Sequence, residues 1–286
     1  MTNITAQMVK ELRDATGAGM MDCKKALSET EGNLEKAIEV LRQKGISSAE
    51  KKMGRIAAEG LVASAIVGDK GAMVEVNCET DFVAKNEEFK ALASDIAKLA
   101  AVSSVSTVEE LLQAEIEGKK LEDVIKEKIA TIGEKITLRR FEKYEGALST
   151  YIHNGKIGVM LLSDKQDEVA GKDVCLHIAS SAPEFLSSAD VPQSVKDEEK
   201  RIEMGKEDLQ SKPEAIREKI VDGRLHKILA QKCLLEQAFV KDPSVSVKDF
   251  IEGKFNIIKF DRYVLGEGLE KREENFAEEV MNQIKG

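Results

Sequence analysis

The sequence has no tryptophan, three tyrosines and nine phenylalanines in 286 residues. A core with so few aromatic side chains has to be built mainly from Leu, Ile, Val, Ala and Met, so an aromatic residue on the surface is notable. Long hydrophobic runs are also missing, because charged residues interrupt every stretch well before the roughly 20 consecutive apolar residues that a membrane-spanning helix needs. We therefore expect no contact with a membrane.

Cysteine is scarce and scattered. Cys23, Cys78, Cys175 and Cys233 form no Cys-x-x-Cys pair, so the sequence indicates neither a zinc site nor a redox motif. Four isolated thiols are typical of a reducing compartment. The first seven residues, MTNITAQ, lack the apolar segment of a secretory signal and the arginine-rich character of a transit peptide. We expect a cytoplasmic protein.

The motifs of common enzyme classes are missing as well. There is no phosphate-binding Gly-x-x-x-x-Gly-Lys-Ser/Thr loop, no Gly-x-Gly-x-x-Gly turn and no Gly-x-Ser-x-Gly elbow. The three histidines, His153, His177 and His226, are too scattered to suggest a metal site. The 52 acidic and 43 basic residues are mixed along the chain, which does not favour direct nucleic-acid binding. We expect a protein that is not an enzyme and that uses no cofactor and no metal of its own.

Residues 4–44 have the pattern of three short helices. Thr5 is placed to cap the first helix, and the glycine-containing turn 16–19 to end it. The second helix is expected from Met20 to Ser28, and the third begins after Asn33. A module this small needs a neighbour or a partner to remain folded.

The third helix carries its apolar residues on one face. They recur at a helical spacing, at Leu34, Ala37, Ile38 and Leu41. Gly45 stands where a glycine commonly ends a helix, so we expect the helix to stop there. The polar residues 47–55 are then predicted to be a linker.

Beyond the linker the pattern changes to alternation, which is typical of strands. Residues 61–67 and 72–76 flank a short turn and predict a β-hairpin. Helices are expected at 87–101, 108–117 and 121–132, the second with a capping box from Thr107 and Glu110, followed by a strand at 136–143. The hairpin pattern recurs at 145–162, before a helix at 168–181. This repeat predicts two related α+β halves in one core.

Residues 190–232 are highly charged and have no strand pattern. Pro213 separates two arms with apolar residues at helical spacing, which predicts an antiparallel helical hairpin. Residues 255–264 have the pattern of a strand that returns to the sheet. A short helix containing Phe276 is expected at the end of the chain.

One loop between a strand and a helix, residues 77–86, places polar residues around a Phe-Val pair. Phe82 beside Asp81 has two interpretations: an ordinary anchor that turns into the core, or a rigid apolar knob that projects next to a charge. A projecting aromatic suits insertion into another protein, because a few buried aromatic anchors carry most of an interface's energy.

Two long segments resemble the signatures of one family, bacterial elongation factor Ts. They are residues 76–85 (VNCETDFVAK) and 12–27 (LRDATGAGMMDCKKAL). The similarity continues at 132–134, at the hairpin with His153, at 179–184 and at the Gly-Glu-Gly segment 266–268, so it covers essentially the whole chain. The match is loose in the charged helical segment.

The resemblance implies an α+β fold in five parts, in agreement with the patterns above. These are a ubiquitin-associated-like three-helix module at 1–54, a core N-subdomain at 55–145, a core C-subdomain at 146–189 and 233–265, an inserted antiparallel coiled coil at 190–232, and a C-terminal module with a helix at 266–286.

The resemblance also implies a function. Elongation factor Ts is a guanine nucleotide exchange factor that speeds GDP release from elongation factor Tu, the GTPase that carries aminoacyl-tRNA, so that GTP can rebind. In the family, a Thr-Asp-Phe-Val segment helps to dislodge the magnesium ion of the GTPase. That segment corresponds to Thr80, Asp81, Phe82 and Val83.

Further contacts with the GTPase are implied at eight positions, namely Lys10, Arg13, Met20, Met21, Lys24, Ile132, Gly133 and His153, and the C-terminal helix around Phe276 is another candidate. The two methionines could instead pack inside the small helical module, and a lone histidine in a turn is usually just solvated. The family also implies a homodimer, which would give a two-plus-two complex with the GTPase.

Two other functions are compatible with the sequence. A passive adaptor or holdase would bind a protein partner without changing any nucleotide off-rate. A small-molecule enzyme would need a cleft between the two halves of the core, and the missing motifs disfavour it.

Overall fold

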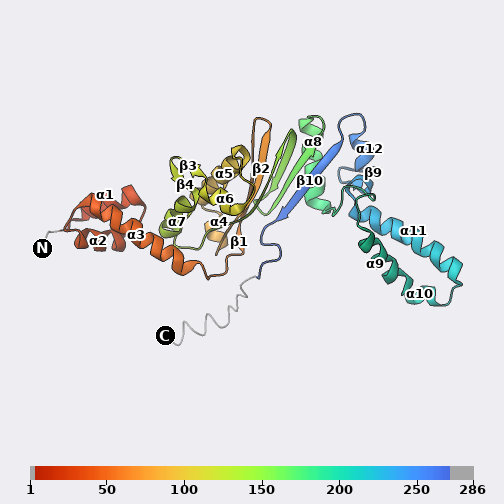
Figure 1. The fold of residues 1–286 in the computed structure, drawn as a ribbon, viewed down its shortest axis with the longest axis horizontal. Helices are drawn as coiled ribbons and strands as arrows, with labels where there is room; N and C mark the ends of the chain where they lie inside the picture. Colours follow the sequence, from red (N-terminus) through yellow and green to blue (C-terminus); the bar gives the residue numbers. More distant parts are fainter. Residues whose placement is uncertain (1–3, 271–286) are drawn as a thin grey trace. The chain divides into compact units, whose positions relative to one another are not determined.

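The structure is a computed structural model that describes residues 4–270 (Figure 1). These residues fall into two compact units, the first made of residues 4–65, 74–141 and 264–270 and the second of residues 66–73 and 142–263. Both units contain helices and strands, which confirms the predicted α+β class. Between residues 4 and 270, none of the helices is both long and apolar enough to cross a bilayer.

The first unit begins with three helices, α1 (Ala6–Thr16), α2 (Met20–Glu29) and α3 (Leu34–Lys52). The Thr5 hydroxyl caps α1 by accepting a hydrogen bond from the backbone N–H of Met8, and Gly17, in the left-handed conformation, ends it. Six buried side chains form the shared core: Val9, Leu12, Cys23, Ala26, Leu27 and Ala37. The prediction of three helices is therefore confirmed.

The predicted end of the third helix is wrong. Helix α3 continues through Gly45 to Lys52, so residues 47–52 are helical and do not form a linker. A Cβ atom on Gly45 would lie 2.9 Å from the Cβ of Ala130 in helix α7 (Leu121–Ile132). The glycine is thus a point of close approach between two helices and not a stop signal, and a single sequence does not distinguish these two uses.

A three-stranded sheet has the order β1-β2-β5, with strands β1 (Glu59–Val67), β2 (Lys70–Cys78) and β5 (Thr137–Glu145). The predicted first hairpin is β1 and β2. Helix α5 (Glu87–Val102) follows, capped by the side chain of Asn86, which accepts a hydrogen bond from the N–H of Glu88.

The next predicted helix, 108–117, is shorter than expected. Helix α6 (Val108–Gln113) has the predicted capping box, but the strands β3 (Glu115–Ile116) and β4 (Lys119–Lys120) follow it. Between these two strands, Glu117 and Gly118 adopt positive φ angles of 51° and 78°. They make a tight turn, so the helix cannot continue to residue 117.

The second unit repeats the strand plan of the first. Its sheet has the order β10-β7-β6, from strands β6 (Ala147–His153), β7 (Ile157–Ser163) and β10 (Ile257–Val264). In both sheets the second strand of a hairpin is central and a strand from much later in the chain pairs with it. Gly60 and Gly146, at the start of the two hairpins, have φ angles of 132° and 133°, so the two hairpins begin with the same unusual backbone conformation.

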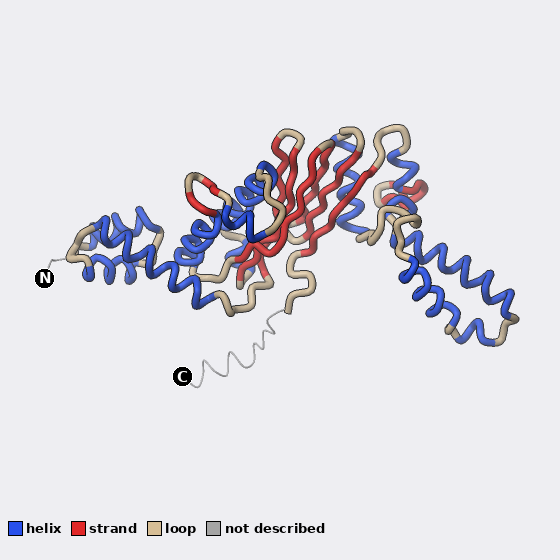
Figure 2. The backbone as a smooth tube through the Cα atoms, in the orientation of Figure 1, coloured by secondary structure: helices blue, strands red, loops and turns tan. Residues whose placement is uncertain are grey.

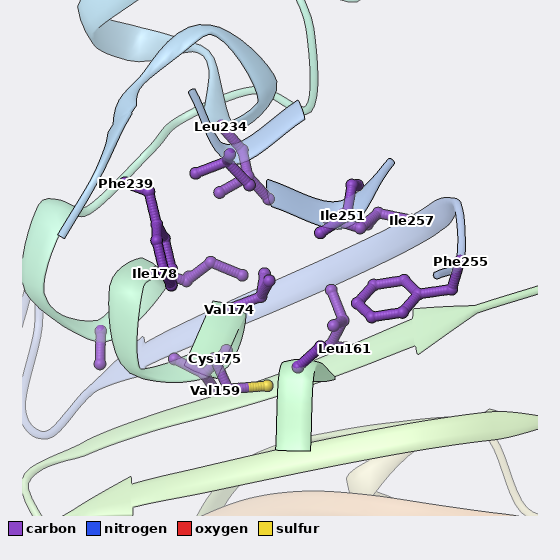
Figure 3. Close-up of a cluster of buried hydrophobic side chains, with 13 residues drawn as sticks. Val159, Leu161, Val174, Cys175, Ile178, Leu234, Phe239, Ile251, Phe255 and Ile257 are labelled. Carbon is purple, nitrogen blue, oxygen red and sulfur yellow. The ribbon is translucent and has the colours of Figure 1, made fainter. Parts of the chain in front are cut away.

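The core of the second unit lies between helix α8 (Glu168–Ser181) and a segment that the sequence patterns did not predict. This segment contains a 3-10 turn (Leu234–Glu236), strands β8 (Ala238–Phe239) and β9 (Asp242–Ser246), and helix α12 (Val247–Ile251). Figure 3 shows Ile178 of α8 beside Phe239 of the segment, and Val174 of α8 on the side of Leu161 of β7.

A helical hairpin also belongs to the second unit, made of α9 (Gln193–Met204), α10 (Glu207–Gln210) and α11 (Glu214–Lys232), as Figure 2 shows in blue. Its arms run antiparallel, since Glu199 lies 3.0 Å from Lys232 while Glu203, later on the first arm, lies 3.5 Å from Arg224, earlier on the second. The terminal helix predicted around Phe276 lies outside the described residues.

The close approach at Gly45 generates a stability prediction. Gly45→Leu should lower the free energy of unfolding by about 1–3 kcal/mol, because the new side chain forces α3 away from Ala130. Gly223→Leu is the matched control, since Gly223 also lies inside a 19-residue helix but has open space at its Cβ position. The control should raise the stability by roughly 0.5–1 kcal/mol in chemical denaturation. Equal effects of the two substitutions would contradict the packing role.

The buried His177 generates a second prediction, on pH. Its Nδ1 accepts a hydrogen bond of 3.1 Å from the N–H of Val240, so its proton is on Nε2, which lies 2.8 Å from Gln237 Oε1. Burial lowers the pKa of His177 below its ordinary value, although the hydrogen bond with Gln237 opposes this shift. As the pH falls, the unfolded chain therefore takes up a proton on His177 before the folded protein does.

The neutral His177 ring stabilises the folded state fully at pH values above the ordinary histidine pKa of about 6.5. This contribution to the free energy of unfolding is lost as the pH falls below that value. His177→Leu should destabilise the protein by about 1–3 kcal/mol at neutral pH, because it leaves Gln237 and the Val240 N–H without this partner. The difference between variant and parent should narrow on acidification, measured as the free energy of unfolding across the pH series. A constant difference would show that His177 does not titrate on unfolding.

Candidate functional site

The turn between strand β2 and helix α5 contains a single helical turn, α4 (Asp81–Ala84). Thr80 begins it, with a side chain that accepts a hydrogen bond of 3.3 Å from the N–H of Val83. A threonine followed by an acidic residue is a favourable helix start, because both groups interact with the exposed N–H groups of the first turn. The sequence therefore fixes where this turn forms.

Phe82 projects from this turn into solvent. Its side chain is 81% exposed, so the core-anchor interpretation is wrong and the ring is a projecting knob. Asp81 accepts a hydrogen bond of 2.6 Å from the ammonium group of Lys85, and the same ammonium lies 6.0 Å from the centre of the Phe82 ring. An apolar ring is thus presented beside an ion pair.

The turn is tied to the end of helix α7 by two glutamates. Glu134 accepts hydrogen bonds from the backbone N–H groups of Glu79 and Thr80, and Glu79 accepts one of 2.6 Å from the N–H of Lys135. Arg55 also approaches Glu79, at 3.3 Å. None of these contacts was predicted, because the partners are far apart in sequence.

A buried thiol lies below the turn. Cys78 donates a hydrogen bond of 3.1 Å to the carbonyl oxygen of Thr80. Burial, with a smaller contribution from the charge of Glu134, raises the pKa of Cys78 to about 12, so the thiol remains protonated and can act as this donor. Its role here is structural.

A groove of about 1220 Å³ lies beside the turn, within the first unit. Val83 and Ile132 line it together with residues of α1, α3 and α7, among them Gly17 and Leu41. Ile132 is half-buried, and Gly133 is exposed with a φ angle of 89° that ends α7. The structure therefore brings Val83 and Ile132 to one surface, close to the residues that carry Phe82.

The candidate residues of the first three helices are all exposed. Met20 and Met21 are 61% and 64% exposed, so they do not pack inside the helical module. Lys10 and Arg13 lie one turn apart on α1, and Lys24 lies one turn after Met20 on α2. Two apolar and three basic side chains are thus accessible on this module.

His153 belongs to the second unit, at the end of β6. It is exposed, with Tyr151 Oη 3.1 Å from Nδ1 and Asn154 Nδ2 3.4 Å from Nε2. Its ring is therefore oriented by neighbouring side chains although it lies on the surface.

A comparison with protein families gives a match that covers much of this chain. The family model described as elongation factor Ts matches residues 79–267, which is more than half of the sequence. The chain belongs to the elongation factor Ts family. Membership implies nucleotide exchange on elongation factor Tu and interaction with that GTPase.

The match to elongation factor Ts includes some of the candidate residues and not others. Residues 80–83, 132–133 and 153 lie inside the matched segment, whereas the five candidates on α1 and α2 precede it. Glu134 is also inside the segment but was not among the predicted site residues. The sequence signal at this position is an acidic residue directly after Gly133, the glycine that ends α7. This signal does not show that Glu134 contacts a loop more than 50 residues earlier in the chain.

The exposure of Phe82 generates a prediction that separates binding from folding. Phe82→Ala should change the free energy of unfolding by less than about 0.5 kcal/mol, because the ring is mostly in solvent. Phe89→Ala, seven positions later on α5, removes a fully buried ring and should cost about 3–5 kcal/mol. Chemical denaturation of the two variants measures the difference. A large loss for Phe82→Ala would mean that the ring packs against the protein in solution.

Proposed function

We propose that this chain promotes GDP release from elongation factor Tu by inserting Phe82 between elements of the GTPase domain. The observation that supports this mechanism is an 81% exposed phenylalanine on a turn that is held by hydrogen bonds. Exposing a large apolar ring to water is unfavourable for the isolated protein, and burying it in a partner recovers that free energy. Binding therefore supplies the energy for a local change in the GTPase.

The target of that change is the magnesium ion of the partner. Mg²⁺ joins phosphate oxygens to protein oxygens and requires near-ideal octahedral geometry, so a small displacement of its ligands weakens nucleotide binding. Asp81, beside Phe82, adds a negative charge at the same place, and Thr80 and Val83 complete the segment. No covalent bond is made or broken in this mechanism, so the chain acts as an exchange factor and not as an enzyme.

Thermodynamic linkage makes the effects of the chain and of GDP on each other's binding reciprocal. If the chain weakens GDP binding by a given factor, GDP weakens binding of the chain by the same factor. GTP then rebinds by mass action and releases the factor. The protein needs no cofactor for this cycle, and a cytoplasmic location is compatible with it.

The remaining candidate residues would enlarge the interface. Met20 and Met21 offer flexible apolar contacts, and Lys10, Arg13 and Lys24 add exposed basic side chains on the same module. In this proposal the three-helix module is ubiquitin-associated-like and docks on the GTPase domain. Ile132, Gly133 and His153 would contact the partner from the core.

The helical hairpin has a separate role in the proposal. As a coiled coil, residues 190–232 would touch another part of the GTPase and support a homodimer, giving a two-plus-two complex. Exposed Ile202 and Ile216, 49% and 50% exposed, are apolar positions on it that such contacts would cover.

The experiment that tests the exchange mechanism is release of labelled GDP from elongation factor Tu. Catalytic amounts of the parent should accelerate release, and Phe82→Ala or Asp81→Ala should reduce the acceleration roughly ten- to hundredfold, as expected for loss of an interface anchor. Val169→Ala is the matched control, because Val169 is an apolar side chain that is 74% exposed on α8. It should exchange at the parental rate.

Other outcomes identify the alternatives. Binding of the GTPase without any change in GDP off-rate would indicate a passive adaptor or holdase. Parental rates for both Phe82→Ala and Asp81→Ala would exclude the insertion mechanism while leaving exchange itself intact.

A further inference from the structure

The carboxylate of Glu134 holds the turn before Phe82 at three points. Oε2 accepts hydrogen bonds of 3.1 Å and 3.0 Å from the backbone N–H groups of Glu79 and Thr80. Oε1 accepts a hydrogen bond of 2.6 Å from the hydroxyl of Thr80. Hydrogen bonds to an ionised carboxylate are among the strongest in proteins, so this single side chain fixes two backbone units and one side chain.

Glu79 makes the return connection. Its carboxylate accepts a hydrogen bond of 2.6 Å from the N–H of Lys135. Lys135 directly follows Glu134, which binds the backbone N–H of Glu79. The end of β2 and the end of α7 are therefore joined in both directions, through residues that are 54 to 56 positions apart. A reciprocal pair of this kind resists twisting of the turn better than one contact would.

The hydroxyl of Thr80 transmits the contact to α4. It donates its proton to Glu134 and accepts from the N–H of Val83, so its one donor and one of its acceptor sites are used in a single orientation. Helix α4 has four residues, which is too short to be stable alone. Phe82, being exposed, adds little packing that could orient it. The direction of the ring thus depends on how Thr80 is held.

We propose that Glu134 is a positioning residue for nucleotide exchange: it orients the Thr80–Val83 turn so that Phe82 is presented ready for insertion. The inference rests on the proposed function, which assigns the insertion to Phe82. Holding the turn in this orientation affects the insertion of Phe82 more than the initial docking on the GTPase, because the rest of the interface with the GTPase is unchanged.

The first test is the dependence of the GDP release rate on the concentration of the chain. Glu134→Ala should lower the maximal rate about tenfold and change the half-saturating concentration less than about threefold. Glu134→Gln keeps an oxygen acceptor at this position and should recover much of the maximal rate. Glu122→Ala is the matched control, because Glu122 is a glutamate in the first turn of α7 whose hydrogen bonds are with Lys126 and Gln113 and not with the turn before Phe82. It should behave as the parent.

A double-mutant cycle tests whether Glu134 acts through Phe82. If it does, Phe82→Ala combined with Glu134→Ala should be no slower than Phe82→Ala alone. If the two substitutions instead lower the GDP release rate by factors that multiply in the double variant, the proposal is overturned, because Glu134 then acts independently of the Phe82 ring.

A spectroscopic test does not depend on exchange. The chain has no tryptophan, so Phe82→Trp introduces a single probe at the knob. Adding Glu134→Ala to this variant should lower the fluorescence anisotropy of the probe, because the turn becomes mobile, whereas adding Glu122→Ala should not. An unchanged anisotropy with Glu134→Ala would overturn the positioning role.

The failures of the two proposals are distinguishable. If the parent does not accelerate GDP release, the proposed function fails, and the anisotropy alone decides whether Glu134 orients the turn. If the parent accelerates release and Glu134→Ala matches it in maximal rate, the positioning role fails and the exchange function stands. If circular dichroism shows that Glu134→Ala does not fold, the test passes to Glu134→Gln and to Thr80→Val, which removes the hydroxyl that contacts Glu134 and the N–H of Val83. A parental maximal rate and unchanged anisotropy in Thr80→Val would overturn the proposal.

Discussion

The hydrogen bonds between the Glu134 carboxylate and the backbone at Glu79 and Thr80 are the contact on which the candidate site depends. An aromatic side chain in a core is oriented by its neighbours, but a ring that is 81% exposed has few neighbours to orient it. Its direction has to come from the backbone that carries it. In a one-turn helix, that backbone is held mainly by the residue that begins the helix and by the groups that hold that residue.

Helix α7 supports more than one part of the first unit. Its C-terminal end leads into Glu134, and its outer side meets α3 where Gly45 approaches Ala130. Gly17, after α1, approaches Thr131 of the same helix, since a Cβ atom on Gly17 would lie 2.6 Å from Thr131 Cγ2. Two glycines thus allow the three-helix module to approach α7, the helix that leads into Glu134.

Local patterns predicted many elements well. The bounds expected for α7 and α8, 121–132 and 168–181, are those observed, because periodic apolar residues and caps are local signals. The predicted end of α3 at Gly45 was wrong because this glycine permits a close contact with Ala130, far along the chain. The predicted helix 108–117 was too long because Glu117 and Gly118 form a turn. The segment 234–251 was missed because its elements are short and are stabilised by the core of the second unit.

The sequence by itself determined where the turn with Phe82 forms, since Thr80 and Asp81 favour a helix start directly after an alternating strand. It also carried the resemblance to elongation factor Ts. Only the tertiary structure decided that Phe82 points into solvent, that Met20 and Met21 are exposed, and that Glu134 holds the turn. The physical reason is that burial and long-range hydrogen bonds depend on which distant segments meet, and spacing along one chain does not contain that information.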